Sequence, residues 1–133
     1  MAEPFRHQLR VRYNECDPQG VVFNANYLTY FDLTMTELWR ELGGYQSMVD
    51  AGVDMVVAEA RIRYRSALGF DDEFEARVTV SELGESSMST EVELARDGET
   101  VAQGELRYVF IESGGSAKQP IPDQIRDRLS AYS

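Results

Sequence analysis

The chain has 133 residues, 43% of them hydrophobic, and this length and composition indicate one domain, residues 1–133, with one packed core. Its formal net charge of −10 argues against a nucleic-acid partner, because nucleic-acid binding needs a concentrated basic surface, and it also disfavours an anionic membrane surface. No apolar run is long enough to span a bilayer, the first residues lack the apolar stretch of a signal peptide, and the one cysteine excludes an internal disulfide, so we expect a cytoplasmic protein.

The first elements that we expect are a strand, a loop and a long helix. From His7 to Tyr13, apolar and polar side chains alternate, which is typical of a half-buried strand. The polar loop that follows contains the chain breakers Asp17-Pro18 and Gly20. A helix is predicted from about Ala25 to Leu42, with Asn24 as its N-cap. Apolar residues recur in it at helical spacing: Tyr27, Phe31, Met35, Leu38, Trp39 and Leu42.

The second half of the chain is predicted to consist mainly of strands. A glycine stop at Gly43-Gly44 and a short helical turn from Tyr45 to Ala51 come first. Apolar and polar residues then alternate in four segments between Asp54 and Phe110, with a two-residue hairpin turn at Asp97-Gly98. A short helix is predicted from Pro122 to Leu129. Strand, helix and four-stranded meander together predict an α+β fold, in which one antiparallel five-stranded sheet wraps around one long central helix.

The loop between the first strand and the long helix is the candidate site. Asp17 supplies a carboxylate there, and the start of the helix supplies unpaired backbone N–H groups and a partial positive charge. Gly20 can adopt a positive φ and lets a ligand approach the backbone closely. A carboxylate and aimed N–H donors on one short loop can attack and polarise a carbonyl, although Asp before Pro is also common in ordinary turns.

The order of elements and one motif resemble the 4-hydroxybenzoyl-CoA thioesterase family, which has the hotdog fold. The motif is Tyr13-x-Glu15-x-Asp17-x-x-Gly20-x-Val22-x-x-x-x-Tyr27. The resemblance implies hydrolysis of an acyl- or aryl-CoA thioester, with Asp17 as nucleophile or as general base for water. It also implies that the amides that polarise the carbonyl lie at the helix start, at Phe23, Asn24 and Ala25. Many relatives carry a histidine in this segment, where this chain has Asn24, whose side chain cannot shuttle a proton.

The resemblance further implies the ligands and the assembly. Coenzyme A enters as part of the substrate, and we expect no other cofactor and no metal. The usual assembly of the family is a homodimer with two sheets joined edge to edge, often paired into a tetramer, with active sites at the subunit interface. Arginine suits the phosphates of CoA, and the expected substrate contacts are Gly20, Val22, Asn26, Tyr27, Arg65 and Ser66.

Several other polar residues have a simpler structural explanation. Glu15 lies two residues before Asp17 and is expected to be a solvated residue or a structural partner rather than a second catalytic acid. Cys16 is expected to pack as a small hydrophobic residue, because His7, the only histidine, lies too far along the chain to form a dyad with it. Asp32, on the long helix, most simply lies on a solvated face, as does Glu37, although other hotdog subgroups place a catalytic carboxylate on the helix.

Some alternatives stay open. The row Arg61, Arg63 and Arg65 suits CoA phosphates or, equally simply, glutamates on neighbouring strands. The same fold also suits a non-catalytic acyl-CoA or acyl-carrier-protein binding module. A dehydratase is disfavoured because His7 cannot meet Asp17 within one chain, and a purely structural oligomer would leave the acidic loop unexplained.

Overall fold

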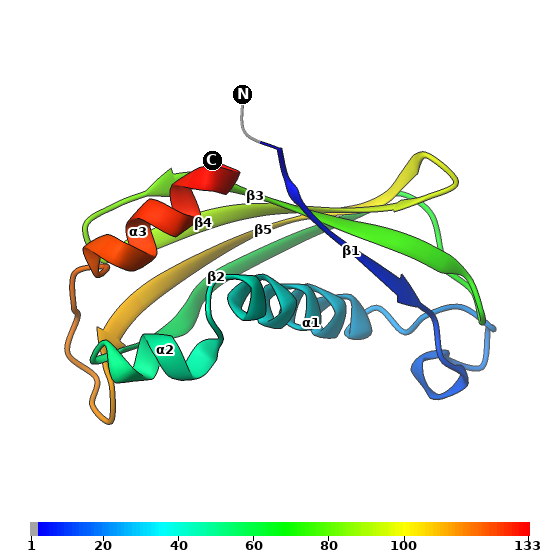
Figure 1. Cartoon of the computed structure of the whole chain (residues 1–133). Coiled ribbons are helices and arrows are strands. Elements are labelled where there is room, and N and C mark those ends of the chain that lie inside the picture. The colour runs from blue at the N-terminus through cyan, green and yellow to red at the C-terminus, as the bar shows by residue number, and fades with distance from the viewer. Residues whose placement is uncertain (1–2) are drawn as a thin grey trace.

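One antiparallel sheet curves around the helix α1 (Asn26–Glu41), which lies against its inner face (Figure 1). The computed structural model describes residues 3–133, and no helix in that range is long and apolar enough to cross a membrane. The other elements are β1 (Phe5–Arg10), the 3₁₀ helix η1 (Tyr13–Glu15), α2 (Tyr45–Asp50), β2 (Val53–Tyr64), β3 (Glu73–Leu83), β4 (Ser87–Arg96), β5 (Glu99–Glu112), α3 (Asp123–Leu129) and the 3₁₀ helix η2 (Ser130–Tyr132).

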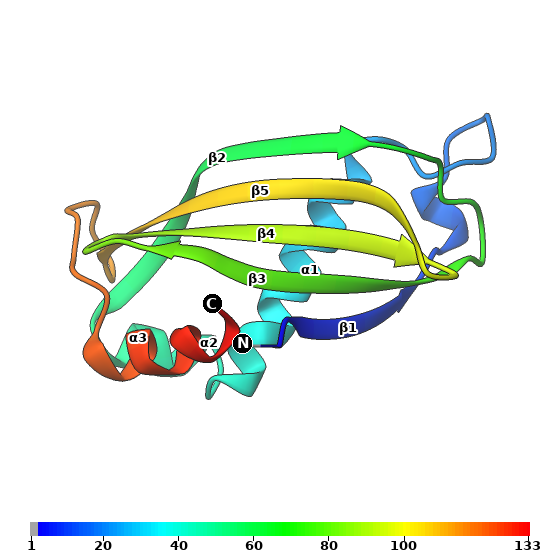
Figure 2. The same ribbon diagram turned by 90° about the horizontal axis from the view of Figure 1, so that it is seen from above.

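The strand order is β1-β3-β4-β5-β2, and each neighbouring pair is antiparallel (Figure 2). The predicted meander is therefore wrong for β2, which pairs with β5 at an edge of the sheet and not with β3. The segment 65–72 carries the chain from β2 across to β3. Arg96 holds it there, since Nη1 donates to the Ala67 carbonyl oxygen at 2.8 Å and to Asp72 Oδ2 at 2.7 Å. Local alternation cannot reveal this crossing, because it does not specify which strands pair.

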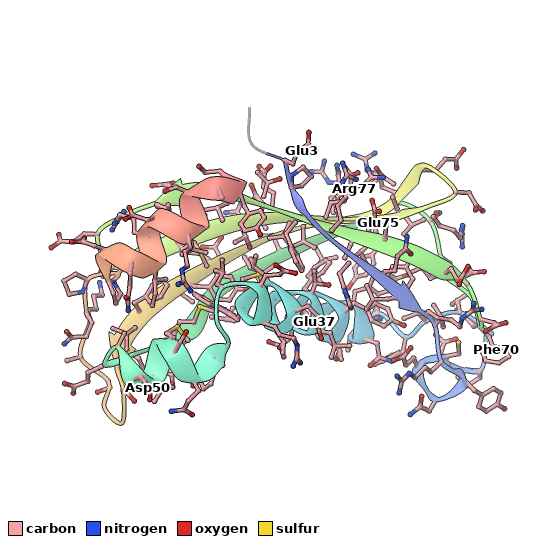
Figure 3. All side chains as sticks on the ribbon, in the orientation of Figure 1. Glu3, Glu37, Asp50, Phe70, Glu75 and Arg77 are labelled. Atoms are coloured by element: carbon pink, nitrogen blue, oxygen red, sulfur yellow. The ribbon has the colours of Figure 1, made fainter. Side chains whose placement is uncertain are left out.

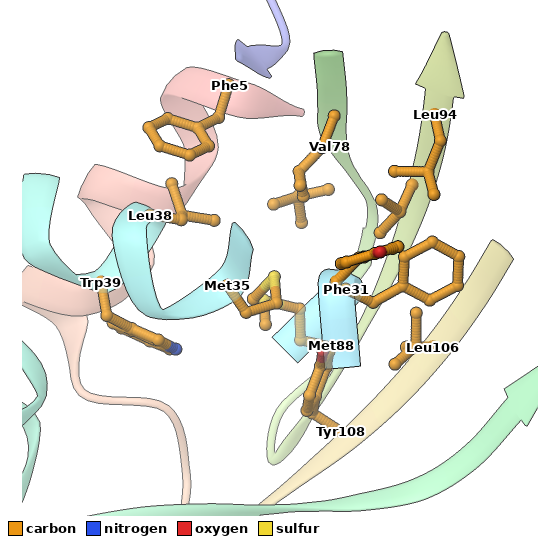
Figure 4. Packing of buried hydrophobic residues seen from close by; sticks show 14 of the residues in the cluster. Phe5, Phe31, Met35, Leu38, Trp39, Val78, Met88, Leu94, Leu106 and Tyr108 are labelled. Carbon is orange, nitrogen blue, oxygen red and sulfur yellow. The ribbon is translucent and has the colours of Figure 1, made fainter. Parts of the chain in front are cut away.

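The core lies between the inner face of the sheet and α1 (Figure 4). The helix approaches the sheet closely at Gly104, where an added Cβ would lie 2.7 Å from Phe31 Cζ, so glycine leaves room for the ring. The predicted apolar face of the helix is confirmed, because all of its members are buried: Tyr27, Phe31, Met35, Leu38, Trp39 and Leu42.

The first strand is shorter than predicted, because β1 ends at Arg10 and η1 follows. Tyr13, the last residue of the predicted strand, is 79% exposed. The reason is Glu15, whose Oε1 accepts the Arg12 backbone N–H at 2.7 Å and closes the 3₁₀ turn. Side chain–backbone bonds of this kind compete with strand pairing, and an alternation pattern does not detect them.

Strand β2 is an edge strand, and much of it is exposed on both faces. Val57 faces inward beside its register partner Tyr108, which is buried, yet Val57 itself is 53% exposed. An apolar strip at this edge therefore stays uncovered in the single chain.

The predicted C-terminal helix is confirmed as α3, which packs through the buried residues Ile125 and Leu129. Arg128 donates from Nη1 to the Leu42 carbonyl oxygen just after α1, and Arg126 donates from Nη2 to the Gly84 carbonyl oxygen at 2.7 Å. These bonds fasten α3 at the end of the molecule opposite the loop after β1 (Figure 1).

Candidate active site

The residues from Cys16 to Val22 form a small closed loop. These two residues make an isolated β-bridge, and the Asp17 amide donates to the Val21 carbonyl oxygen at 2.9 Å. The Gly20 amide donates to the Asp17 carbonyl oxygen at 2.9 Å and closes a tight turn. Gly20 has the expected positive φ, 80°, and a Cβ added there would meet no atom within 4 Å. The backbone at Gly20 is therefore open to approach from outside.

The Asp17 carboxylate is half-buried and held in one orientation. Its Oδ1 accepts the Gln19 amide at 2.8 Å, which is an Asx turn. No salt bridge within residues 3–133 involves Asp17. Asp17 is thus a turn residue that also presents a carboxylate without a cationic partner in the described chain.

Glu15 joins this loop to α1. Its Oε1 accepts the Tyr30 hydroxyl at 2.8 Å, and its backbone carbonyl oxygen accepts the Phe23 amide at 2.9 Å and Asn26 Nδ2 at 2.8 Å. Burial raises the pKa of Tyr30, and the bond to Glu15 raises that pKa further, so the phenol stays a hydrogen-bond donor. Glu15 is therefore the structural partner that was predicted, although η1 rather than a strand sets its direction.

A second connection holds the loop against the segment between β2 and β3. The Val22 amide donates to the Leu68 carbonyl oxygen at 2.8 Å, and the Leu68 amide donates to the Tyr27 hydroxyl at 3.2 Å. Phe70 belongs to this segment, and Figure 3 labels it at one end of the molecule. The loop after β1, the start of α1 and the segment 65–72 thus form one hydrogen-bonded unit.

Asp72 stiffens the same unit from the other side. Its Oδ2 accepts the Gly69 amide at 2.8 Å and Arg96 Nη1 at 2.7 Å. The bond from Gly69 lowers the pKa of the Asp72 carboxyl, and Arg96 lowers it further, while partial burial opposes the change. The net effect favours an ionised carboxylate that anchors the turn.

The three amides predicted to polarise a carbonyl differ in availability. The Phe23 amide already donates to the Glu15 carbonyl oxygen, so the prediction for Phe23 is wrong. The amides of Asn24 and Ala25 have no hydrogen-bond acceptor in the part of the chain that the structure describes. Two backbone donors at the start of α1 therefore stay free for a ligand.

The start of α1 also differs from the prediction in its cap. The N-cap is Ala25 rather than Asn24, and no side chain caps the helix. Asn26 is used differently, since its Nδ2 donates to the Glu15 carbonyl oxygen. A side-chain cap would have taken up first-turn donors, so its absence is consistent with a site that binds an oxygen atom there.

Several of the predicted substrate contacts also support the loop. Val22 and Tyr27 are buried, and Asn26 Nδ2 donates to the Glu15 carbonyl oxygen, while contact of these three residues with a substrate stays a prediction. Arg65 donates from Nε and Nη2 to Gln103 Oε1 at 3.1 and 2.9 Å. Ser66 is exposed, and it follows Arg65 at the end of β2.

Tyr64, one residue before Arg65, reaches the helix start, and the sequence did not indicate it. Its hydroxyl donates to the Asn24 carbonyl oxygen at 3.1 Å, and its ring packs edge-on against Tyr27 with centroids 5.1 Å apart. Tyr64 and Asn24 are separated by 40 positions along the chain. No local pattern could relate them, because their contact depends on β2 lying at the edge nearest the start of α1.

The simpler predictions for other polar residues hold. Cys16 is half-buried against the core. His7 lines a shallow depression with Glu37 and Arg40 of the second half of α1, so it lies away from the helix start. Glu37 Oε2 accepts Arg40 Nε at 3.1 Å, and Asp32 is exposed. Within residues 3–133, no group of three His, Cys, Asp or Glu residues is placed to hold a metal ion.

A depression of about 650 Å³ lies on the outer face of the sheet, and we do not assign the site to it. This face lies on the side of the sheet away from α1, where Figure 3 labels Arg77 and Glu75. Its charges are partly paired internally, since Arg61 Nε contacts Glu59 at 2.8 Å and Arg77 Nη1 contacts Glu93 at 2.9 Å. Arg61 is therefore paired within its own strand, β2, whereas the structural explanation of the arginine row expected a glutamate on a neighbouring strand.

Comparison with known proteins agrees with this geometry. Residues 11–129 match the family model of the thioesterase-like superfamily. The acyl-CoA thioesterase YbgC of Haemophilus influenzae is 26% identical over 92% of this chain and 91% of its own length. The crystal structure of a hypothetical protein of Aquifex aeolicus, AQ1494, is 28% identical, with a TM-score of 0.87 over 95% of this chain and 99% of the other. The structure of BH1999 gentisyl-coenzyme A thioesterase is 26% identical, with a TM-score of 0.84 over 93% of this chain and 98% of the other.

Proposed function

The chain belongs to the thioesterase-like superfamily and has the hotdog fold, and from this premise we propose that it hydrolyses an acyl- or aryl-CoA thioester to the free acid and CoA. The observation that supports this most is that one carboxylate and two backbone amides lie in the short segment between η1 and α1. The Asp17 carboxylate has no cationic partner in the described chain, and the amides of Asn24 and Ala25 have no acceptor there. Hydrolysis of a thioester needs both kinds of group: one that delivers an oxygen nucleophile to the carbonyl carbon, and hydrogen-bond donors that stabilise the charge on the carbonyl oxygen.

The proposed reaction begins when the carbonyl oxygen of the substrate accepts the N–H groups of Asn24 and Ala25. Asp17 then takes a proton from a water molecule whose oxygen bonds to the carbonyl carbon, or its own oxygen bonds there to form an anhydride that water hydrolyses. In both routes the carbon–sulfur bond breaks and CoA leaves as a thiolate. In the first route the thiolate takes up the proton that Asp17 removed from the water; in the second it takes up a solvent proton, and hydrolysis of the anhydride by water returns one and restores the Asp17 carboxylate. One such N–H donor is typically worth about 10²–10³ in rate, and a positioned carboxylate base about 10²–10⁴.

Coenzyme A acts in this proposal only as part of the substrate. Arg63 has no salt bridge within residues 3–133, but it lines the depression on the outer face of the sheet, so Arg65 and Ser66 after the end of β2 are the proposed phosphate contacts. Arg65 would have to leave Gln103 to make such a contact, and Ser66 beside it is already exposed. Arginine binds phosphate oxygens in a bidentate manner, which fits a ligand that carries several phosphates.

The active unit in this proposal is a homodimer formed at β2, with further pairing to a tetramer left open. Edge strands with an apolar, uncovered side are natural pairing sites, and β2 is twelve residues long with Val57 exposed on its inner side. A second copy running antiparallel along β2 would extend the sheet and cover this strip. The start of α1 lies next to the end of β2, as the Tyr64–Asn24 bond indicates, so the site would lie beside the subunit boundary.

The test is release of free thiol from a panel of acyl- and aryl-CoA thioesters. We expect the wild-type protein to release CoA, and Asp17→Asn to lose most turnover while keeping its fold and CoA affinity. Asp97→Asn is the matched control, because Asp97 lies in the β4–β5 turn and forms no salt bridge in the described chain. Near-wild-type hydrolysis by Asp17→Asn would exclude Asp17 as the catalytic carboxylate, and binding without thiol release would favour a binding module.

A further inference from the structure

The peptide group that joins Asn24 to Ala25 has its two polar atoms in different situations. Its oxygen accepts two hydrogen bonds, from the Tyr64 hydroxyl at 3.1 Å and from the Tyr27 amide at 3.3 Å. Its N–H, on Ala25, has no acceptor among the residues that the structure describes. The same peptide is thus anchored at the oxygen and free at the nitrogen.

Tyr64 is well placed to hold that oxygen. It is the last residue of β2, where its backbone is in register with Ala102 of β5. Its ring packs edge-on against Tyr27, at 5.1 Å and 87° between ring planes. Tyr27 is itself buried and fixed by the Leu68 amide, which donates to its hydroxyl. The Tyr64 hydroxyl is therefore held by the sheet and by a buried neighbour, although the side chain is 49% exposed.

A hydrogen bond to the oxygen of an amide strengthens the N–H of the same amide as a donor, because bonds in a chain polarise one another. A fixed peptide plane also keeps the N–H aimed before substrate arrives, which is the condition for effective stabilisation of a developing oxyanion. We infer that Tyr64 is a positioning residue that orients and polarises the Asn24–Ala25 peptide, so that the Ala25 N–H binds the carbonyl oxygen of the thioester. This inference rests on the proposed thioesterase function and adds a residue that it did not include.

The first test removes only the hydroxyl, with Tyr64→Phe. We expect kcat for a thioester from the panel to fall about tenfold, less than the 10²–10³ for removing such a donor outright, because the Ala25 N–H is still present. KM should stay within about twofold, because an interaction that matters mainly in the transition state lowers kcat rather than ground-state binding. Tyr45→Phe is the matched control, because Tyr45 is 50% exposed and begins α2, at the other end of the molecule (Figure 1).

The second test reads the amide directly and needs no turnover. In the ¹H–¹⁵N NMR spectrum, we expect the Ala25 amide proton to move upfield in Tyr64→Phe and to stay unchanged in Tyr45→Phe, because the N–H is less polarised without the bond to the Asn24 oxygen. If the wild-type protein released no thiol from any thioester, the proposed function would fail while this measurement still decided whether Tyr64 polarises the peptide. An unchanged Ala25 shift, an unchanged kcat or a rise in KM alone would each overturn the inference.

Discussion

The Tyr30 hydroxyl donates to Glu15 Oε1 at 2.8 Å, and this single bond links the second turn of α1 to the residue two places before Asp17. Tyr30 is fully buried, and Glu15 also receives the Arg12 amide on the same oxygen. The acidic loop is therefore anchored to the core through the buried side chain of Tyr30. The first prediction concerns this anchor.

Removing either partner of the Glu15–Tyr30 bond should destabilise the protein. We expect Tyr30→Phe and Glu15→Ala each to lower the free energy of unfolding by about 1.5–3 kcal/mol, the range for hydrogen bonds to charged groups. In the double variant the effects should be less than additive, with a coupling of about 1 kcal/mol. Urea unfolding of the four proteins measures this. A coupling below about 0.3 kcal/mol would mean that the two side chains act independently.

Gly104→Ala should disturb the closest contact between α1 and the sheet. The added Cβ would lie 2.7 Å from Phe31 Cζ, inside van der Waals contact, so we expect a loss of about 1–3 kcal/mol in the free energy of unfolding. Combining it with Phe31→Leu should cost less than the sum of the single changes, because the smaller side chain leaves room for the methyl group.

Gly69→Ala is the control for that experiment, because a Cβ there would meet its nearest atom at an ordinary 3.7 Å. Thermal unfolding followed by circular dichroism compares the variants. If Gly104→Ala and Gly69→Ala were equally stable, the close approach of the Phe31 ring to Gly104 would not contribute to the stability of the fold.

Asp72 should make stability depend on acid pH. The Gly69 amide and Arg96 lower the pKa of Asp72 in the folded state, so the folded protein holds the proton less tightly than the unfolded chain does. The stabilisation is therefore present above the unfolded pKa of about 3.9 and is lost as pH falls through the lower folded value. We expect Asp72→Asn to be less stable at pH 7 and to lose less stability on acidification.

Unfolding by urea at a series of pH values between neutrality and pH 2 measures the Asp72 effect. Asp97→Asn, in the β4–β5 turn, serves as the control for loss of one negative charge. Parallel curves for wild type and Asp72→Asn would contradict the prediction, because they would show that Asp72 does not contribute to the acid dependence.

Val57→Lys should weaken the proposed dimer. Val57 is 53% exposed on the edge strand β2, and a charge there would be desolvated if a second copy covered the strip. Sedimentation velocity should show the wild-type protein as a dimer or larger, and the variant shifted toward the monomer. Ser81→Lys places the same charge at an exposed position of β3, inside the sheet order, and should leave the assembly unchanged. A monomeric wild type would exclude the β2 dimer.

Much of the fold followed from local patterns. The apolar spacing from Tyr27 to Leu42 predicted α1 to within one residue at each end, since the helix runs from Asn26 to Glu41. The Asp97-Gly98 turn is confirmed, with φ of 53° and 81°. The motif around Asp17 also predicted the family, which the match over residues 11–129 confirms. These features depend on neighbours within a few positions, so a single sequence contains them.

The candidate site was predicted less completely. Asp17 and Gly20 were placed correctly in the loop, but the Phe23 amide was counted as free although Glu15 uses it. The first strand was predicted to continue past Arg10 because an alternation pattern does not detect the hydrogen bond from the Arg12 amide to Glu15. Each of these differences comes from one hydrogen bond that competes with a regular element.

The sequence by itself determined the α-helices, most of the strands and the acidic loop, because helical spacing, alternation and turn residues are properties of nearby positions, and the motif around Asp17 indicated the family by resemblance. Only the tertiary structure decided that β2 lies at the edge beside β5, and therefore that Tyr64 meets the Asn24 carbonyl oxygen 40 positions away. It also decided which amides at the start of α1 stay free, since that depends on which carbonyl oxygens the fold brings within reach. Pairing between distant segments costs chain entropy that only the whole core repays, so no local pattern encodes it.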